Sequence, residues 1–527
     1  MATAYNEAVD IIRPVEYPSL TTRNDNDRSI IYLDHAGATL YPRSLITSYT
    51  ADLQSAIYGN PHSESTPSRA SSARVTTART QLLHFFGADP RHFDLVFTAN
   101  ATAAVKLVGE CLERRGGGRG FRYVYHQDAH TSLVGVRQTA EESVCLEDDA
   151  SVERWIRRGG SAWSWQARLG MPRREEMVTL LGYPGQSNMT GRRLPRSWPA
   201  QIRSNSAHRT TYTLWDAAAL ASTSPLSLSD VDAAPDFTAV SLYKIFGLPD
   251  VGCLIVRKAS AHLLVSQARY FGGGTVDMVA NPSPGSSSSC AWHAVKTDTL
   301  HDALEDGTLP FHSLLAVGHA VRLHEDLLGG MARVSAHCAF LASRLYAALD
   351  GLRHANGSKL VRVYTGSGRA AFGDPTLQGP TVAMAVVDPS GRVHGYADVE
   401  RAADADGVYL RSGSVCNPGG MSYLGWTKMQ DRVAAFEAGH RCSAPIQEVG
   451  GRATGIVRVS LGAMSSLGDV DGFVEWLTRK YLDVYVDDRG SSSFSLGAFK
   501  ETVEEGIVAR RYDACIVRLV RGLVRFR

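Results

Sequence analysis

Apolar and polar positions follow two alternating patterns along most of the chain, beginning near residue 30. Short apolar runs rich in β-branched and aromatic residues predict strands, whereas stretches with apolar residues at every third or fourth position predict helices. The candidate strands are residues 30–34, 94–99, 121–125, 177–184, 212–220, 237–247 and 252–258. A helix is predicted over residues 102–115. Because strands alternate with helices, the pattern predicts an α/β fold with a mostly parallel sheet, in which ligands bind beyond the carboxyl ends of the strands.

The pattern changes near residue 311, where helices are predicted up to residue 350 and strands follow at 381–388 and 455–461. The expected parts are an N-terminal extension (1–29), a large domain (30–310), a smaller α+β domain (311–480) and a linker with a basic tail (481–527). Residues 151–174, rich in Arg and Trp without clean periodicity, are expected to form an inserted loop. In the tail, Arg518, Arg521 and Arg525 would share one helical face.

Composition narrows the possible classes of protein. The 527 residues are 44% hydrophobic and 20% charged, as in ordinary soluble proteins, and the net charge of +2 gives no indication of nucleic-acid binding. No apolar run approaches the ~18 residues of a membrane span, and the N-terminus does not resemble a signal peptide. The eight cysteines are scattered without a C-x-x-C pair. We therefore expect no metal site and reduced thiols in a cytoplasmic protein.

Two residues at strand ends suggest a cofactor with a carbonyl and a pyridine ring. Lys244 lies in SLYKIFG, where a strand runs into a turn. Partial loss of hydration there would favour the neutral amine that forms Schiff bases, although most lysines at strand ends are simply solvated. Asp216, in TLWDAAAL, could pair with a protonated pyridine nitrogen, or it could cap the alanine-rich segment that follows.

Two further strand ends carry groups suited to a phosphorylated ring. The segment FTANATAAVK leads from a strand into a helix, where backbone N–H groups and the Thr102 hydroxyl could cradle a phosphate. A plain capped helix fits this segment equally well. His130 follows the strand at 121–125 and could stack on the ring, although a lone histidine is more often structural.

The C-terminal half contributes a thiol and a buried cation. Cys416 lies in the polar loop RSGSVCNPGG, close in sequence to Arg411, and nearby positive charge favours a thiolate. An inert, buried cysteine is the alternative, but it suits a strand residue such as Cys253 better. Arg458 stands inside the apolar strand GIVRVSL, so it needs an anionic partner such as a substrate carboxylate, unless it lies on an edge strand.

Taken in order, these segments resemble class V, fold-type I pyridoxal-phosphate (PLP) enzymes of the cysteine desulfurase group. The resemblance is strongest to the N-terminal desulfurase domain of eukaryotic molybdenum cofactor sulfurases. The motifs that carry it are YLDHAGATLYP (32–42), GNPHS (59–63), FTANATAAVKLV (97–108), QSNMTG (186–191), SLYKIFGLPDVGCLIV (241–256), YFGGGTV (270–276), LEDGT (304–308), RSGSVCNPG (411–419) and TGIVRVSLGAMSS (454–466).

The resemblance implies a role for each candidate residue. Lys244 would bind PLP as a Schiff base, Asp216 would pair with the pyridine nitrogen and His130 would stack on the ring. The phosphate would be bound by Ala101, Thr102 and Ser241, and by Thr275 of a second subunit in a homodimer. Asn188 would contact substrate or cofactor, Arg458 would hold the carboxylate of L-cysteine, and Cys416 would take the substrate sulfur as a persulfide. Tyr243 and Ala219 depart from the histidine and glutamine of many desulfurases.

The implied activity is conversion of L-cysteine to L-alanine, with the sulfur passed from Cys416 to a separate acceptor. Because only a short tail follows the matched segments, we expect the chain to lack the C-terminal cofactor-binding domain of full sulfurases. A related carbon–sulfur lyase or aminotransferase acting on a specialised small molecule is the first alternative, since the 151–174 insertion could reshape the pocket. A catalytically dead partner protein is the second, and the complete set of candidate residues argues against it.

Overall fold

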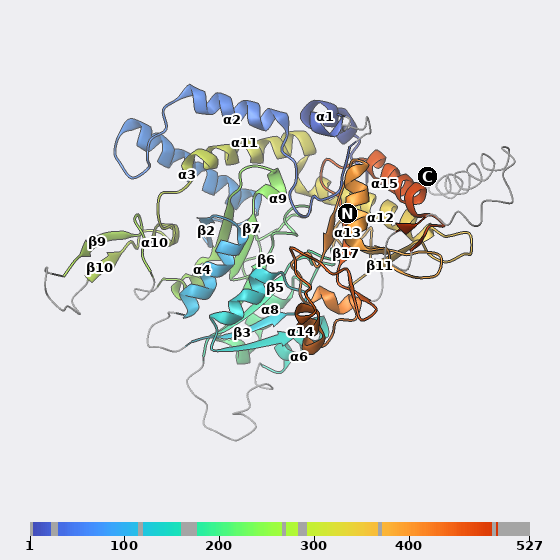
Figure 1. The fold of residues 1–527 in the computed structure, drawn as a ribbon. Coiled ribbons are helices and arrows are strands. Elements are labelled where there is room, and N and C mark those ends of the chain that lie inside the picture. Colours follow the sequence, from blue (N-terminus) through green and yellow to red (C-terminus); the bar gives the residue numbers. More distant parts are fainter. Residues whose placement is uncertain are drawn as a thin grey trace, which may run out of the picture.

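The computed structural model describes residues 4–22, 30–113, 120–159, 177–265, 270–282, 292–366, 371–486 and 492–493. A seven-stranded sheet occupies the centre of the first half, in the order β2–β8–β7–β6–β5–β3–β4 (Figure 1). Its strands are β2 (Phe93–Thr98), β3 (Arg122–His126), β4 (Glu142–Leu146), β5 (Thr179–Pro184), β6 (Thr211–Asp216), β7 (Phe237–Ser241) and β8 (Gly252–Arg257). Strands β3 to β7 run parallel and β8 is antiparallel to both its neighbours. The mostly parallel sheet predicted from the sequence is therefore confirmed.

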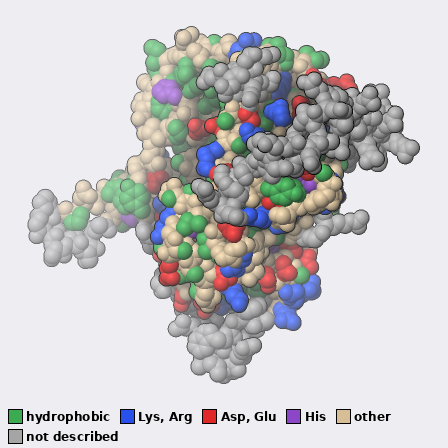
Figure 2. Space-filling model, turned by 45° about the vertical axis from the view of Figure 1, so that its right-hand side comes forward, with side chains coloured by type: hydrophobic (Ala, Val, Ile, Leu, Met, Phe, Trp, Pro, Cys, Tyr) green, Lys and Arg blue, Asp and Glu red, His purple; other side chains and the backbone are tan. Residues whose placement is uncertain are grey.

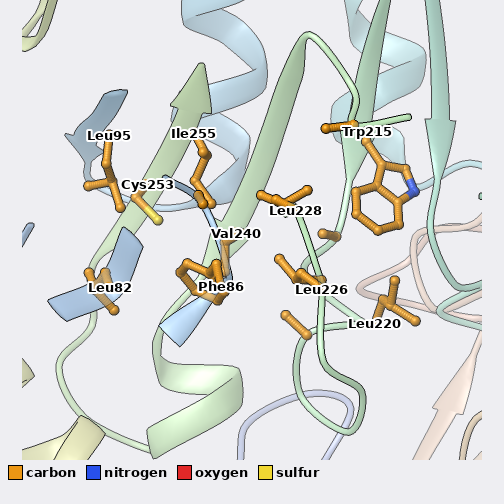
Figure 3. Packing of buried hydrophobic residues seen from close by; sticks show 14 of the residues in the cluster. Leu82, Phe86, Leu95, Trp215, Leu220, Leu226, Leu228, Val240, Cys253 and Ile255 are labelled. Atoms are coloured by element: carbon orange, nitrogen blue, oxygen red, sulfur yellow. The ribbon is translucent and has the colours of Figure 1, made fainter. Parts of the chain in front are cut away.

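Both faces of this sheet are buried, because alternate residues of each strand enter different apolar clusters. Leu95 of β2 packs with Val240 and Ile255 on one face, while Val96 packs with Leu254 on the other. Figure 3 shows the first of these clusters, in which Leu82 of a covering helix and Phe86, just after that helix, meet the strand residues. The helices around the sheet are α2 (Arg43–Ser55), α3 (Thr66–Phe85), α4 (Ala101–Glu113), α5 (Thr131–Gly135), α6 (Asp149–Arg157), α8 (Trp198–Ser204) and α9 (Tyr243–Phe246).

A second, four-stranded antiparallel sheet lies in the C-terminal half, in the order β11–β12–β17–β14. Its strands are β11 (Val361–Tyr364), β12 (Thr381–Val386), β14 (Arg411–Gly413) and β17 (Ile456–Ser460). The helices of this half are α11 (Phe311–Leu328), α12 (Gly330–Gly351), α13 (Tyr396–Ala405), α14 (Met429–Glu437) and α15 (Leu467–Tyr481). Leu314, Val317 and Ala320 of α11 pack into the cluster of the large sheet, so α11 joins the two halves.

The N-terminal residues belong structurally to the C-terminal half. Strand β1 (Ile31–Tyr32) pairs in parallel with β13 (Val408–Tyr409), and Asp34 forms a bridge to Ser460 of β17. Helix α1 (Ala8–Glu16) lies within the expected N-terminal extension, where Arg13 forms an ion pair with buried Asp469 of α15. The strand partner of residues 30–34 could not be predicted from the sequence, because β-pairing between segments so far apart in the chain leaves no local signal.

The remaining elements are short and lie mostly at the surface. Strands β9 (Val276–Ala280) and β10 (Trp292–Val295) form a hairpin that projects from the body (Figure 1). The other elements are η1 (Pro18–Leu20), η2 (Val136–Gln138), η4 (Ser206–His208), η5 (Lys258–Leu263), α10 (Leu300–Leu304), η6 (Gly420–Leu424), β15 (Glu448–Val449), β16 (Arg452–Ala453), β18 (Tyr485–Val486) and β19 (Ser492–Ser493). None of the helices within the described residues is long and apolar enough to cross a membrane.

The prediction of an inserted loop at residues 151–174 is wrong for its first residues. Helix α6 extends to Arg157, and Asp148 caps it by accepting a hydrogen bond from the backbone N–H of Ser151 at 2.8 Å. Val152, Trp155 and Ile156 are buried, and their spacing is the helical signal that the charged residues between them obscured. Residues 160–174, the rest of that expectation, and the basic tail with Arg518, Arg521 and Arg525 lie outside the described residues.

Candidate active site at the end of the large sheet

Lys244 lies in the one-turn helix α9, immediately beyond the carboxyl end of β7. Gly247 ends this helix with a φ of 78°, and a Cβ at that position would lie 2.4 Å from the backbone nitrogen of Tyr41. Only glycine therefore allows the turn to pack this closely against the preceding segment. Ile245 and Phe246, the two residues before Gly247, are buried in the core of the large sheet. The lysine is thus held by an apolar anchor at a strand end, as the sequence predicted.

Burial lowers the pKa of Lys244 from its ordinary value, and the nearby carboxylate of Asp216 partly offsets this effect. Asp216 is the last residue of β6, is 8% exposed, and accepts a hydrogen bond from the backbone N–H of Ala218 at 3.0 Å. Asp216 therefore acts both as a local cap and as the anion beside the lysine. The two roles weighed for Asp216 from the sequence are compatible in this geometry.

His130 begins α5 just beyond β3 and is partly buried. Its Nδ1 accepts a hydrogen bond from the backbone N–H of Ser132 at 3.1 Å, which leaves Nε2 as the proton-bearing nitrogen of the neutral ring. Burial lowers the pKa of His130; the charge of Asp216 opposes this, and those of Lys244 and Arg458 reinforce it. These mutual effects show that the structure brings His130, Asp216, Lys244 and Arg458 into one electrostatic environment.

The N-terminus of α4 lies beside these residues with amide groups left for a ligand. Asn100 caps Ala103 through its side chain at 2.9 Å and Ala104 through its carbonyl at 3.1 Å. The amide of Ala101 makes only a long 3.4 Å contact with the Ser241 hydroxyl, and the Thr102 side chain is exposed. Gly252 permits this approach, because a Cβ there would lie 2.3 Å from the carbonyl carbon of Asn100. Ala101, Thr102 and Ser241 are therefore grouped at a helix N-terminus, which favours anions.

Arg458, in the middle of β17, is 2% exposed and already has an anionic partner. Its Nη2 donates to Asp34 Oδ1 at 2.7 Å and its Nη1 donates to the carbonyl of Asn188 at 2.9 Å. Arg411, directly opposite on β14, donates from Nε to Asp34 Oδ2 at 3.0 Å. Among the described residues, the buried Nε of Arg458 has no hydrogen-bond partner. One donor of the guanidinium thus remains for a carboxylate ligand.

Cys416 is exposed, and its backbone has an unusual conformation. Val415 and Cys416 have φ values of 46° and 55°, in the left-handed region that costs non-glycine residues on the order of 1–3 kcal/mol each. Asn188 Nδ2 donates to the carbonyl of Val415 at 2.6 Å, and the amide of Thr131 donates to the carbonyl of Cys416 at 2.9 Å. The thiol is therefore tied through its own backbone to the segment that carries His130.

Thr275 lies apart from this group within the chain. Its side chain is 1% exposed and its hydroxyl donates to the carbonyl of Gly272 at 2.9 Å, at the base of the β9–β10 hairpin. Tyr243 and Ala219, which depart from the common pattern, are partly buried and buried respectively. The structure thus gathers nine of the ten candidate residues and leaves Thr275 outside.

Three residues of this region were not singled out from the sequence: Asp34, Asp128 and Asn417. Asp34 stands in the quoted motif YLDHAGATLYP, and an acid there could have been matched to Arg458, which was expected to need an anion. Asp128 and Asn417 are buried polar residues in loops, with 3% and 0% exposure. No local pattern reveals such pairs, because their partners come from distant segments.

The residues present fit a PLP group by the chemistry of their donors. A partly buried lysine with a lowered pKa lies beside an anion, an imidazole and a helix N-terminus with amides available for a phosphate. Lys244 would hold the cofactor, Asp216 and His130 would contact its ring, and Ala101, Thr102 and Ser241 would receive its phosphate. A carboxylate beside the pyridine nitrogen keeps that nitrogen protonated.

Known proteins resemble this chain over most of its length. The family model described as Aminotransferase class-V matches residues 31–473. A molybdenum cofactor sulfurase of Aspergillus fumigatus is 48% identical over 483 residues, which cover 91% of this chain and 54% of the fungal protein. That of Botryotinia fuckeliana is 44% identical over 506 residues, covering 95% of this chain and 59% of its own. This chain therefore spans about half the length of the curated relatives it matches.

Solved structures show the same fold at much lower sequence identity. A cysteine desulfurase from Thermococcus onnurineus superposes with a TM-score of 0.64 at 18% identity, covering 91% of this chain and 99% of its own. The cysteine desulfurase CsdA of Escherichia coli gives a TM-score of 0.62 at 18% identity, covering 90% and 98%. At this identity the likeness supports the fold alone, and it agrees with the fold-type I architecture expected from the motifs.

Proposed function

The chain belongs to the aminotransferase class-V family of PLP-dependent enzymes, and from that premise we propose that it is a cysteine desulfurase. In this proposal L-cysteine is converted to L-alanine, and its sulfur is carried as a persulfide on Cys416 to a separate acceptor. The observation that carries the proposal is the position of Cys416. The loop of this exposed thiol is joined through its backbone to Thr131, which follows His130, and to Asn188, whose carbonyl accepts from Arg458.

The residues would divide the work between the two ends of the substrate. Arg458 would hold the substrate carboxylate through its free Nε, with Asn188 beside it. Bound PLP would supply an electron sink for the substrate Cα. The lowered pKa of Lys244 favours the neutral amine that captures the cofactor and later moves a proton at Cα. His130 would keep its single proton on Nε2, facing away from its Ser132 contact.

Sulfur transfer would take place at Cys416. Its thiolate would attack the substrate sulfur, so that a new S–S bond forms as the substrate Cβ–S bond breaks. The electron pair of the broken bond would stay with Cβ and take up a proton, which leaves L-alanine as product. A reducing, cytoplasmic location would keep this thiol free, and Cys416 forms no disulfide within the described residues.

We include a homodimer in the proposal because Thr275 and its hairpin do not serve the site within one chain. The hairpin and the segment before it expose large apolar side chains, namely Tyr270, Met278, Val279 and Trp292. A second copy would cover these residues and could bring Thr275 to the partner's phosphate group. Figure 2, by contrast, shows acidic and basic side chains interspersed on one face of the molecule, rather than a single basic patch.

The chemistry of the transfer indicates the chemical class of the sulfur acceptor. The curated relatives are described as molybdenum cofactor sulfurases, and we extend to this chain the general role of donating persulfide sulfur. The acceptor would be a thiol of a separate protein. Its thiolate would attack the outer sulfur of the Cys416 persulfide, so that a new S–S bond forms on the acceptor and the Cys416 thiolate is released.

The test is turnover of L-cysteine by the purified, PLP-loaded protein in the presence of a thiol reductant, beside Cys416→Ser and Cys442→Ser. Cys442 is a matched control because it is also an exposed free cysteine of the C-terminal half. We expect equal amounts of alanine and sulfide from the unaltered protein and from Cys442→Ser. Cys416→Ser should lose this activity about a hundredfold or more.

Other products would overturn the proposal. Pyruvate and ammonia formed equally well by Cys416→Ser would identify a carbon–sulfur lyase in which Cys416 has no chemical role. Transfer of the amino group to a keto acid would identify an aminotransferase.

A further inference from the structure

Asn417, the residue after Cys416, is fully buried although its neighbour is exposed. Its side-chain Nδ2 donates to Asp128 Oδ1 at 2.6 Å and to Asn188 Oδ1 at 3.1 Å. Its Oδ1 accepts from the backbone N–H of Gly420 at 2.8 Å. Each polar atom of this amide is therefore hydrogen-bonded, and the buried side chain anchors the loop that carries the Cys416 thiol.

Asp128 is the acceptor at the centre of this arrangement. It lies between β3 and His130, is 3% exposed, and also accepts from the Ser187 hydroxyl at 2.8 Å. Its second oxygen faces Arg192 Nη2 at 3.9 Å and the Tyr423 hydroxyl at 3.5 Å. A buried carboxylate needs such partners to remain charged. The same short segment thus carries a ring-facing histidine and the anchor of the cysteine loop.

The loop needs an anchor because its backbone is held in an unfavourable region. Val415 and Cys416 both have positive φ, and Val415 is β-branched, the residue class least suited to that conformation. Such conformations persist only when surrounding contacts over-determine them. Here Gly419 packs directly against the backbone of Gln127, the residue before Asp128, since a Cβ at Gly419 would lie 1.8 Å from the carbonyl oxygen of Gln127. Arg432 adds a hydrogen bond from Nη1 to the carbonyl of Pro418 at 2.5 Å.

We propose that Asp128 is a positioning residue for sulfur transfer: through Asn417 it holds Cys416 in the left-handed conformation that presents the thiol beside Asn188 and His130. The inference rests on the proposed desulfurase function. Asp128 acts through Asn417 and does not itself touch the substrate. Its effect should appear in the step that uses the thiol, while binding of cofactor and substrate depends on other residues.

The first test compares Asp128→Asn with Asp149→Asn. Asp149 is a matched control because it binds the same Arg192, at 2.7 Å, while its other partner within the described residues is His126, which lies outside the cysteine loop. We expect Asp128→Asn to lower kcat for alanine formation on the order of tenfold to a hundredfold. The KM for L-cysteine and the absorbance change on adding L-cysteine should stay near those of the unaltered enzyme. Asp149→Asn should leave kcat within about twofold, whatever it does to the melting temperature.

A second variant guards against a folding defect in Asp128→Asn. Asn417→Ala keeps the Asp128 carboxylate and removes only the Asn417 amide, so it should reproduce the fall in kcat. The exchanged pair Asp128→Asn with Asn417→Asp restores an amide–carboxylate hydrogen bond at the same place. It should recover part of the kcat that Asp128→Asn loses, whereas Asn417→Asp alone sets two carboxylates together and should be worse.

Hydrogen–deuterium exchange over residues 411–420 tests the anchor without relying on activity. We expect faster exchange of these amides in Asp128→Asn and Asn417→Ala, and unchanged exchange in Asp149→Asn. If the unaltered protein makes no alanine, the proposed function fails, while the exchange data still test the anchor. If Asp128→Asn lowers kcat no more than Asp149→Asn, or if exchange over 411–420 is unchanged, the positioning role is wrong.

Discussion

The two sides of the candidate site are built in different ways. On the cofactor side, Lys244 lies in α9 just beyond β7 and Asp216 is the last residue of β6, so both stand within regular secondary structure. On the sulfur side, Cys416 lies in a loop with two residues in the left-handed region, held by hydrogen bonds from distant segments. The cofactor side rests on apolar packing, whereas the sulfur side rests on directed polar contacts.

This difference predicts how well each side of the site tolerates amino-acid substitutions. Apolar packing is non-directional, so neighbours of similar volume can replace one another at modest cost. Buried hydrogen-bond networks lose more when one partner is removed, because the other partner stays buried and unsatisfied. We therefore expect the cofactor side to be robust except at its reacting groups, and the sulfur side to be sensitive at residues that touch no reactant. Three further variants test this expectation.

The largest effect is expected from Lys244→Ala. Without the amine the protein should no longer hold PLP covalently, and activity should fall about a thousandfold or more. The visible absorbance of the bound cofactor and the rate of alanine formation measure both losses. Lys258→Ala, at an exposed lysine just beyond β8, is the control and should change neither. Because burial lowers the pKa of Lys244, PLP capture should persist at lower pH than capture by an ordinary lysine.

An intermediate effect is expected from Asp34→Asn, which removes the anion shared by Arg458 and Arg411. The Arg458 side chain is 3% exposed, so the variant leaves a buried cation without its counter-charge. We expect a loss of about 3 kcal/mol in the free energy of unfolding, measured by urea denaturation. Arg411→Gln removes the half-exposed ion pair with Asp34 and should lower the free energy of unfolding by about 1 kcal/mol or less. Equal losses in the two variants would contradict the assigned geometry.

The smallest effect, a stabilising one, is expected from His324→Leu in α11. The ring of His324 packs edge-on against Phe246, two residues after Lys244, and within the described part of the chain neither ring nitrogen has a hydrogen-bond partner. Replacing the imidazole with an apolar side chain should raise the free energy of unfolding by about 1 kcal/mol at pH 7. His337 is equally buried but hydrogen-bonded to Asn6 and Ser465, so His337→Leu should instead destabilise.

The pH dependence of unfolding gives an independent check on His324. Burial lowers its pKa from 6.5 to about 4, so between these values the unfolded chain binds a proton that the folded chain does not. Stability should therefore fall as the pH drops from 6.5 towards 4. His35 and His337, with pKa values also lowered to about 4, contribute in the same direction. His324→Leu should reduce this slope without abolishing it, and an unchanged slope would contradict the burial argument.

Part of the site could be predicted from the sequence because its residues occupy regular positions. Lys244, Asp216 and His130 each follow an apolar run that predicts a strand, and parallel strands bring their carboxyl ends to one edge of a sheet. Arg458 was correctly expected to need an anion. The sequence suggested a substrate carboxylate, whereas the structure supplies Asp34, over four hundred residues earlier, as a resident partner.

The sequence by itself determined most strands of the large sheet, the α/β class and the family motifs, because hydrophobic periodicity and local turn residues are encoded over a few neighbouring positions. Tertiary structure alone decided that β1 joins the C-terminal half, that Asp34 binds Arg458 and Arg411, and that Asn417 anchors the cysteine loop on Asp128. These are pairings between single polar residues or short strands far apart in the chain. Such pairings leave no periodic signal, since each depends on two positions that only the packed fold brings within hydrogen-bond distance.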